Sequence, residues 1–297
     1  AGDDSLAGGA GTADWAIYAE LTATTQAVTV SLATLSATGA AGSDSLSSIE
    51  NIISGAGNDC LLGDANANIL SGEAGNDTLS GGAGDDSLAG GIGNDWLNYA
   101  ELTATTQAVT VSLASLRATG AAGSDTLSGF ENVLSGAGND CLVGDGVANM
   151  LAGLAGNDTL SGDVGDDTLD GGAGADLILG GSGNDCLIGA LGIDQFVFNT
   201  ALGLDGVDTI SGYSVTDDTI VLDDAIFAGI GAAGTSLAAG AFTIGAAATT
   251  SAHRIIYNNV TGALFYDADG SGAGSVVQFA TLAGVTGTIT AAEFVII

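Results

Sequence analysis

Residues 81–98 read GGAGDDSLAGGIGNDWLN and contain the same nine-residue pattern twice. Glycines fill the first half of each nonapeptide, an aspartate stands at its sixth position, and a leucine stands at its eighth. The pattern extends on both sides, so that residues 54–98 hold five units and residues 135–197 hold seven. Across these 12 units position 8 is always apolar, and positions 4 and 6 are Gly and Asp in ten units each. A repeat this regular predicts a solenoid built from one small structural unit.

Each unit combines a glycine-rich turn with a very short strand. The last three residues alternate outward, inward and outward, as strand residues do, so the apolar side chain of position 8 points into a core. The glycines among the first six residues suit a tight turn with positive φ angles. Two turns and two strands then complete one coil of two units, and the position-8 side chains of the two faces meet in a thin core.

The charge of the chain is strongly one-sided. Its 297 residues carry 35 acidic and 2 basic side chains, which gives a formal net charge of −33. A protein that binds nucleic acids or anionic membranes needs clustered Lys and Arg, so neither is expected as a partner of this chain. No stretch approaches the ~18 apolar residues of a membrane-spanning helix, and no transmembrane segment is expected. The partner that the composition demands is a cation.

Stacked coils would place the aspartates of position 6 in columns. Each carboxylate would lie roughly 4.8 Å from its neighbour on the next coil, because that is the spacing of hydrogen-bonded strands. Carboxylates so close together cannot all stay ionised without a counter-ion. Carboxylate and carbonyl oxygens suit calcium, with its six to eight flexible oxygen ligands, better than zinc or magnesium. The spacing therefore predicts multiple calcium ions between the turns.

The pattern GGxGxDxUx resembles the repeat of the RTX (repeats-in-toxin) calcium-binding family. The resemblance implies an all-β fold, namely a right-handed parallel β-roll with a C-terminal β-rich capping domain. It also implies that calcium is held by the position-6 aspartates and by carbonyl groups of the glycine loops. The ligands would be Asp4 in the truncated first unit, then Asp59, Asp77, Asp86, Asp95, Asp140, Asp158, Asp167, Asp176, Asp185 and Asp194. Asn68 and Asn149 replace the aspartate in two units, whose loops are expected to bind calcium weakly or not at all.

A longer duplication overlies the nonapeptides, because residues 99–116 nearly repeat residues 18–35. Each copy contains a 36-residue insertion that lacks the motif, and this length equals four units, so the coil could continue in register. The predicted domains are residues 1–98 with insertion 18–53, residues 99–197 with insertion 99–134, and the C-terminal cap 198–297.

Each insertion carries a partial motif, GSDSL or GSDTL, that contains Asp44 or Asp125. Each of these aspartates stands 15 residues before the next position-6 aspartate, which places both off the regular lattice. We predict that both are calcium ligands, and the alternative is that they cap a turn.

The last hundred residues read as strands separated by turn signals. Residues 254–267, RIIYNNVTGALFYD, predict a β-hairpin. In DADGSG, which follows, Asp267 and Asp269 stand at the first and third ligand positions of an EF-hand-like loop. Gln278 replaces the bidentate Glu of such a loop, so an acidic turn is the alternative to a calcium site.

The motifs favour a binding or structural protein over an enzyme. The only histidine is His253, and the sequence shows no zinc motif, no convincing catalytic triad and no phosphate-binding loop. The terminal EFVII resembles the end of a type I secretion signal, which implies export by the type I secretion machinery of a Gram-negative bacterium. Calcium sites of the extracellular class bind at about 10⁻⁴ to 10⁻³ M, so the chain would fold only after export.

Two functions remain open for such a secreted chain. One is a self-assembling cell-surface or matrix component, such as a surface-layer or filament subunit. The other is the secretion and folding module of a larger secreted enzyme, toxin or adhesin, with which a start part-way through a repeat is compatible. Cys60, Cys141 and Cys186 all occupy position 7, which should face outward, where they either form intermolecular disulfides or replace Thr without a further role.

Overall fold

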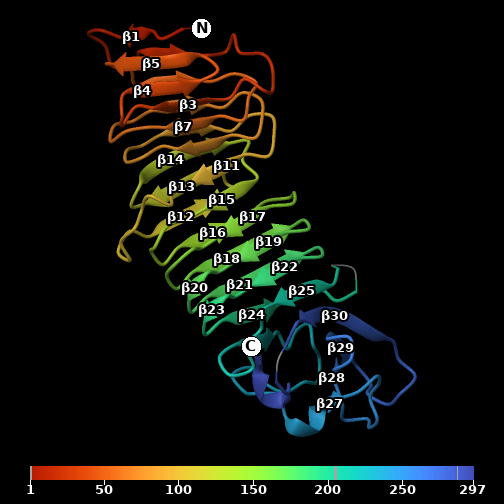
Figure 1. Cartoon of the computed structure of the whole chain (residues 1–297). Helices are drawn as coiled ribbons and strands as arrows, with labels where there is room; N and C mark the ends of the chain where they lie inside the picture. The colour runs from red at the N-terminus through yellow and green to blue at the C-terminus, as the bar shows by residue number, and fades with distance from the viewer. Residues whose placement is uncertain (1, 204–205, 286) are drawn as a thin grey trace. The chain divides into compact units, whose positions relative to one another are not determined.

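The computed structural model describes residues 2–203, 206–285 and 287–297. The chain divides into two compact units, residues 1–142 and residues 143–297. Both units are built almost entirely from short β-strands that lie side by side (Figure 1). The predicted all-β fold, a β-roll of stacked parallel strands, is confirmed.

The repeating element of both units is a three-residue strand at positions 7–9 of a nonapeptide. In the first unit β7 (Cys60–Leu62) pairs in parallel with β9 (Thr78–Ser80). In the second unit β19 (Thr168–Asp170) pairs in the same way with β22 (Cys186–Ile188). Paired strands are therefore two nonapeptides apart in the sequence, which confirms the predicted coil of two units.

Two sheets form the unit of residues 1–142. The strands of one are, in spatial order, β1 (Ser5–Ala7), β5 (Gly42–Ser47), β4 (Ser36–Gly39), β3 (Val28–Ser31), β7, β9, β11 (Trp96–Asn98) and β15 (Asn132–Leu134). Those of the other are β2 (Trp15–Ile17), β6 (Asn51–Ile53), β8 (Ile69–Ser71), β10 (Ser87–Ala89), β14 (Gly123–Ser128), β13 (Arg117–Gly120) and β12 (Val109–Ser112). Strand β16 (Cys141–Val143) spans the boundary between the units.

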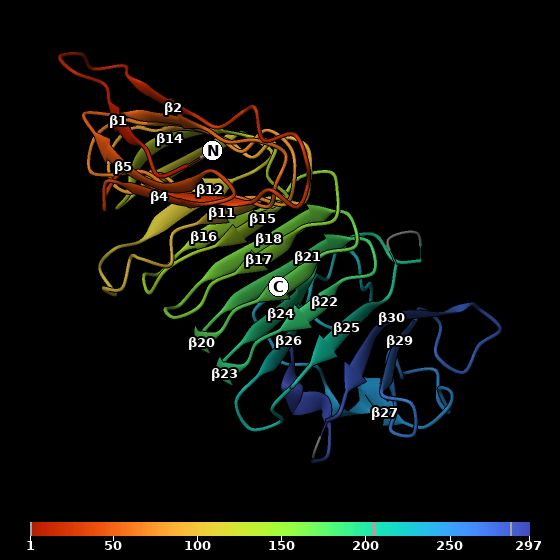
Figure 2. The same cartoon turned by 45° about the horizontal axis from the view of Figure 1, so that its top comes forward.

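The unit of residues 143–297 also contains two long sheets. One consists of β17 (Met150–Ala152), β19, β22, β25 (Asp208–Ser211), β30 (Val276–Ala283), β29 (Ala263–Asp267), β28 (Ile255–Asn258) and β27 (Phe242–Ile244). The other consists of β18 (Thr159–Val164), β21 (Leu177–Ser182), β24 (Gln195–Phe198), β26 (Thr219–Leu222) and β31 (Phe294–Ile296). A pair of two-residue strands, β20 (Ala173–Gly174) and β23 (Leu191–Gly192), joins neighbouring loops (Figure 2).

The core is formed by the side chains of position 8, as the repeat predicts. None of the twelve is more than 1% exposed; they are Leu61, Leu70, Leu79, Leu88, Leu97, Leu142, Leu151, Leu160, Leu169, Ile178, Leu187 and Phe196. Full burial of such a side chain contributes roughly 1.5–3 kcal/mol. This column of buried side chains fixes the register of the strands and therefore the position of every aspartate two residues earlier in the repeat.

The insertions do not continue the coil in register, and that prediction is wrong. In the first copy β3, β4 and β5 form an antiparallel meander, and in the second copy β12, β13 and β14 do the same. The reason is the sequence Gly39-Ala40-Ala41-Gly42, a two-residue hairpin turn whose flanking glycines have φ angles of 119° and 113°. Two reversals restore the original direction, so β5 pairs in parallel with β1, and β3 pairs in parallel with β7.

The residues after 198 extend the sheets of the second unit. Strands β25 and β26 pair in parallel with β22 and β24, and β30 and β31 then pair in parallel with β25 and β26. The predicted hairpin is confirmed, because β28 and β29 pair antiparallel. This β-rich region lies in the same compact unit as the nonapeptides that precede it.

Helical structure in the described residues is limited to two 3₁₀ turns, η1 (Ala239–Ala241) and η2 (Ala291–Glu293). Among the described residues, no helix is long and apolar enough to cross a membrane.

Candidate metal centre

The position-6 aspartates lie immediately before each short strand and are buried. None of the ten is more than 2% exposed; they are Asp59, Asp77, Asp86, Asp95, Asp140, Asp158, Asp167, Asp176, Asp185 and Asp194. Buried ionised carboxylates are costly unless a donor or a cation compensates for the lost water. The surroundings of each oxygen therefore decide what the site can bind.

One oxygen of each carboxylate ties neighbouring coils together. Asp77 Oδ1 accepts a hydrogen bond from the backbone N–H of Asp59 at 2.7 Å, and Asp95 Oδ1 accepts one from Asp77 at 2.7 Å. In the second unit, the N–H groups of Asp158 and Asp176 donate in the same way to the Oδ1 atoms of Asp176 and Asp194. We call each such stack of acids a carboxylate column. The predicted stacking of aspartates two nonapeptides apart is confirmed.

The other carboxylate oxygen accepts no hydrogen bond at many of these positions. Among the described residues, buried Oδ2 atoms without a hydrogen-bond partner occur on Asp14, Asp77, Asp86, Asp95, Asp167, Asp176, Asp185 and Asp194. Leaving a buried acceptor unsatisfied costs about 1–3 kcal/mol, and more when it is charged. A native fold does not repeat this penalty along a column unless another group supplies the positive charge.

Carbonyl oxygens converge on the same space as these Oδ2 atoms. A Cβ atom placed on Gly72, at position 1, would lie 2.3 Å from Asp77 Oδ2 and 2.6 Å from the carbonyl oxygen of Gly90 on the next coil. At Gly162 the corresponding distances are 2.2 Å to Asp167 Oδ2 and 2.4 Å to the carbonyl oxygen of Gly180. Only glycine fits at these positions, because a side chain would occupy the space that the two oxygens face.

This set of donors fits calcium. Within the described part of the chain, no group of three or more His, Cys, Asp or Glu side chains is arranged to hold a metal ion. A cation would therefore take a carboxylate oxygen and several backbone carbonyl oxygens, which is the ligand type that calcium accepts. The residues present would hold calcium between adjacent coils and would supply no redox or nucleophilic chemistry there.

The pKa values of these acids reflect the same cost of burying a carboxylate without a counter-charge. Burial raises the pKa of Asp77 and of Asp86 from the ordinary 3.8 to about 7, against the hydrogen bonds that lower it. Burial likewise raises the pKa of Asp167 and of Asp194 to about 6. Without a cation these carboxyl groups would take up protons near neutral pH, whereas a bound cation would keep them ionised.

Asp44 and Asp125 differ from the other predicted ligands. The expectation that they lie off the lattice is wrong, because their Oδ1 atoms accept hydrogen bonds from Asp4 and Asp86, both at 3.0 Å, as the next acids of the columns. Their Oδ2 atoms accept hydrogen bonds from the hydroxyl groups of Tyr18, at 3.0 Å, and Tyr99, at 2.5 Å. A phenol thus occupies the place at which the nonapeptide acids lack a donor, and the role of these two aspartates as calcium ligands stays a prediction.

The two asparagines of position 6 act as neutral members of the columns. Asn68 is 1% exposed, its Oδ1 accepts a hydrogen bond from Asp64, and its Nδ2 donates to the carbonyl oxygen of Glu50 at 2.8 Å. Asn149 Oδ1 accepts the equivalent bond from Asp145. An amide satisfies its neighbours without a cation, which supports the expectation of weak or no calcium binding at these loops.

The remaining predicted ligands lie outside this pattern. Asp4 is exposed, in contrast to the other position-6 aspartates. Asp267 Oδ1 accepts a hydrogen bond from the N–H of Asp269 at 3.2 Å, and Asp269 Oδ2 accepts one from Gly274 at 3.0 Å. These are the contacts of an acidic turn, and whether the turn also holds calcium stays a prediction.

Five acids of the columns were not predicted from the sequence. Glu50 and Glu131 accept hydrogen bonds from Asp14 and Asp95, at 2.9 and 2.8 Å. The full set of missed acids is Asp14, Glu50, Glu131, Asp208 and Asp218. A signal was present for all five, because each stands two residues before a buried apolar residue, as the position-6 aspartates do.

Comparison with known proteins agrees with this geometry. Residues 62–97, 143–178 and 161–196 match the family model described as the RTX calcium-binding nonapeptide repeat (4 copies). These segments are RTX repeats, and calcium is the ion that such repeats bind, as the sequence predicted. Proteins with these repeats are typically secreted by Gram-negative bacteria. No curated protein matched the sequence.

Two solved structures are similar to parts of the chain. The extracellular lipase of Serratia marcescens is 21% identical over 82% of this chain and 39% of the lipase chain, with a TM-score of 0.31. A subunit of the mannuronan C5-epimerase of Azotobacter vinelandii is 24% identical over 53% of this chain and 77% of the subunit, with a TM-score of 0.24. The chain thus spans 39% of the length of the lipase.

Proposed function

From the RTX calcium-binding repeats that the chain carries, we propose that it is an exported protein that folds when calcium binds outside the cell. We further propose that the folded roll is a self-assembling structural component of a cell surface or matrix. Type I secretion machinery is the proposed export route, with several calcium ions bound per chain.

The observation that carries the calcium-dependent fold is the row of buried carboxylate oxygens without partners. Asp77, Asp86 and Asp95 each hold one such oxygen in the first unit. With a formal net charge of −33, the chain has too few basic groups to compensate for them. Sites of the extracellular class bind calcium at about 10⁻⁴ to 10⁻³ M, so they would stay empty inside a cell and fill after export.

Exposed apolar side chains on the glycine loops support an assembly role. Ile92 is 80% exposed, and Leu191 and Ile193 are 74% and 62% exposed. We propose no catalytic role for the chain, because its single histidine, His253, serves a local turn in which Nδ1 accepts a hydrogen bond from Thr249. Self-assembly through the apolar loops would make use of the repeat without any reactive group.

The three cysteines would allow covalent cross-links between assembled chains. All three are free thiols of intermediate exposure at the starts of their strands; they are Cys60, Cys141 and Cys186. Disulfides between chains stay a prediction, and electrophoresis of the native protein without reductant tests it. A purely monomeric band would contradict cross-linking.

Calcium titration of the full chain tests the first half of the proposal. Far-UV circular dichroism should show little strand signal in excess chelator and a cooperative gain of strand signal as calcium reaches the millimolar range. A spectrum that chelator leaves unchanged would contradict calcium-dependent folding.

Electron microscopy of the calcium-loaded protein tests the second half. Ordered lattices or fibres that dissolve in chelator are expected for a structural subunit. Persistently monomeric particles would contradict self-assembly. A catalytic or adhesive domain encoded in the same reading frame would favour the alternative of a secretion and folding module.

A further inference from the structure

A groove lies on the first unit beside the turn that joins β3 to β4. Its volume is about 740 Å³, which is within the range of ~300–1,000 Å³ that ligand sites in proteins occupy. The residues that line it come from four segments and are 31–35, 62–66, Ser80, Gly82, Ala83 and Glu101. We call it the meander groove, because residues 31–35 form the first turn of an antiparallel meander.

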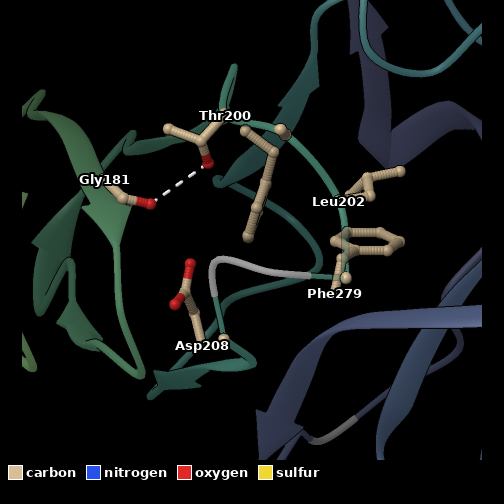
Figure 3. A pocket seen from close by; sticks show the side chains of 9 residues that line it. Gly181, Thr200, Leu202, Asp208 and Phe279 are labelled. Atoms are coloured by element: carbon tan, nitrogen blue, oxygen red, sulfur yellow. Dashed lines mark hydrogen bonds between the residues drawn. The ribbon is translucent and has the colours of Figure 1, made fainter.

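The size of the meander groove sets it apart from a small cavity in the second unit. Figure 3 shows that cavity, which Thr200, Asp208 and Phe279 help to line. Its volume is about 20 Å³, so it takes no more than a water-sized group. The meander groove, in contrast, has room for several side chains of another molecule.

The lining of the meander groove is largely apolar, with negative charge at Asp64 and Glu101. Leu35 and Leu62 supply apolar side chains, and Leu35 is 50% exposed. The Glu101 carboxylate accepts a hydrogen bond from the Ser80 hydroxyl group at 2.7 Å and keeps the capacity to accept others. Among the described residues that line the groove there is no Lys or Arg to balance these acids. An occupant of complementary chemistry therefore combines an apolar side chain with a base.

The first unit carries that combination at Leu116 and Arg117, where the turn between β12 and β13 ends. Leu116 is 51% exposed, and Arg117 is exposed as well. Arg117 is one of the two basic residues of the chain. The other, Arg254, donates from Nη1 to the carbonyl oxygens of Ser251 and His253, at 2.8 and 2.9 Å. Within the described part of the chain no acid forms an ion pair with Arg117, so its charge is available to a carboxylate of another chain.

The groove and the arginine turn belong to different sheets of the unit. The turn that lines the groove follows β3 in one sheet, whereas β12 and β13 lie in the other sheet. The outer faces of the two sheets point away from the core of position-8 side chains that they share, so a turn on one sheet does not reach a groove on the other. Leu116 and Arg117 therefore fit the meander groove of a second chain.

The internal duplication shows that the fold of this turn does not need the arginine. Ser36 lies opposite Ser31 in the first copy, and Arg117 lies opposite Ser112 in the second copy, in the same register. The residue before each, a leucine, has a φ angle of 57° in both copies. The first turn thus lines the groove without a base, and the second turn carries the base that the groove lacks.

We propose that the meander groove holds the turn of residues 113–117 from a second copy of this chain. Leu116 packs on the apolar wall at Leu35, and Arg117 forms an ion pair with Glu101. The inference rests on the proposed self-assembly and identifies one contact of it. Because the two surfaces are unlike, each chain gives one turn and receives another, and such contacts build rings or open filaments.

Sedimentation velocity of the calcium-loaded full chain over a range of protein concentrations tests this contact. Arg117→Ser copies Ser36 of the first turn, and Glu101→Gln removes the charge but keeps an acceptor for the Ser80 hydroxyl group. We expect each variant to need about tenfold more protein than the unsubstituted chain for half-maximal assembly, because each leaves the opposite charge without its partner. Glu20→Gln is the matched control and should assemble normally, since Glu20 stands at the same place in the first copy of the sequence YAELTATTQ but does not line the groove.

The outcomes separate this inference from the proposed function. An unsubstituted chain that stays monomeric at every calcium and protein concentration would contradict the proposed self-assembly and this contact with it. A chain that assembles, and does so equally well with Arg117→Ser and Glu101→Gln, would overturn the groove contact alone. Loss of assembly in Arg117→Ser but not in Glu101→Gln would also overturn it, because Arg117 would then dock on another surface.

Chemical modification of arginine in the unsubstituted chain decides the matter if a variant does not fold. Assembly should protect Arg117 from phenylglyoxal, and mass spectrometry of the digested protein measures the modification. An Arg117 side chain that reacts equally in the monomer and in the assembly would overturn the contact.

Discussion

Asp86 and Asp125 are neighbours in one carboxylate column, yet the molecule compensates for their burial in two ways. Asp86, in a nonapeptide, has an Oδ2 atom with no hydrogen-bond partner, whereas Asp125, in an insertion, receives the Tyr99 hydroxyl group on the same atom. The nonapeptide therefore depends on a cation from solution, and the insertion supplies its own donor. The comparison indicates that the columns contain both calcium-dependent and calcium-independent links.

The largest effect that this difference predicts is on the pH dependence of the stability of the metal-free chain. The pKa of Asp77 and of Asp86 is about 7 in the fold and 3.8 when unperturbed, so the folded state binds protons more tightly than the unfolded state. Stability without calcium should then be greatest at low pH and should be lost as pH rises from about 4 to about 7, because several acids act together.

Circular dichroism and thermal melting in excess chelator between pH 5 and pH 8 measure this effect. We expect strand signal and melting temperature to fall as the pH rises. A metal-free chain that becomes more stable toward pH 8 would show that neither protons nor calcium offset the burial of the unpartnered carboxylate oxygens. That result would contradict the difference between the nonapeptides and the insertions.

Removal of one phenol hydroxyl should have a smaller effect. Tyr99→Phe deletes the donor at 2.5 Å and leaves Asp125 with a buried, unsatisfied oxygen, which should cost about 1–3 kcal/mol of the free energy of unfolding in saturating calcium. Urea denaturation at fixed calcium concentration measures the loss.

Tyr257→Phe is the control, because it removes a hydroxyl group from a buried tyrosine of strand β28, outside the carboxylate columns. The difference between the two variants isolates the contribution of the bond to Asp125. If Tyr99→Phe were as stable as the control, the tyrosine would not be compensating for the carboxylate.

Replacement of Asn68, a neutral residue in a carboxylate column, by aspartate should have the smallest effect. Asn68→Asp replaces the Nδ2 donor, which lies 2.8 Å from the Glu50 carbonyl oxygen, by an oxygen that repels it unless a cation bridges them. We expect one additional calcium ion per chain and a modest rise in the calcium concentration at the midpoint of folding.

Asn76→Asp adds the same charge at an exposed position where a sister unit already carries Asp85, and it should leave the calcium count unchanged. A calcium count for Asn68→Asp that equals that of this control would show that a carboxylate at position 6 is not sufficient to create a site.

The nonapeptide region could be predicted closely because two simple periodicities coincide there. Apolar residues at position 8 determined the core and the register, and the aspartates two residues earlier then had to stack. The insertions could not be predicted in the same way, because the GAAG turn at 39–42 competes with continuation of the coil and reverses the chain. The donors from Tyr18 and Tyr99 escaped prediction because each lies 26 residues from its partner.

The late acids of the columns were missed for a related reason. Asp208 and Asp218 each begin the triplet DTI, which repeats the last part of the motif. Gly203 and Gly206 stand at positions 1 and 4 before Asp208, whereas the residues before Asp218 lack both glycines. At Asp218 the strand and its acid persist without the glycines, since burial of Ile220 is sufficient to hold the strand in the sheet. A search for acids two residues before a buried apolar residue would have found both.

Anomalous diffraction from calcium-loaded crystals tests the central claim most directly. The account predicts calcium beside the Oδ2 atoms of Asp77, Asp86 and Asp95, and the Tyr99 hydroxyl group, not an ion, beside Asp125. Columns that stack without any bound ion, or a calcium ion in place of the tyrosine hydroxyl group at Asp125, would contradict it.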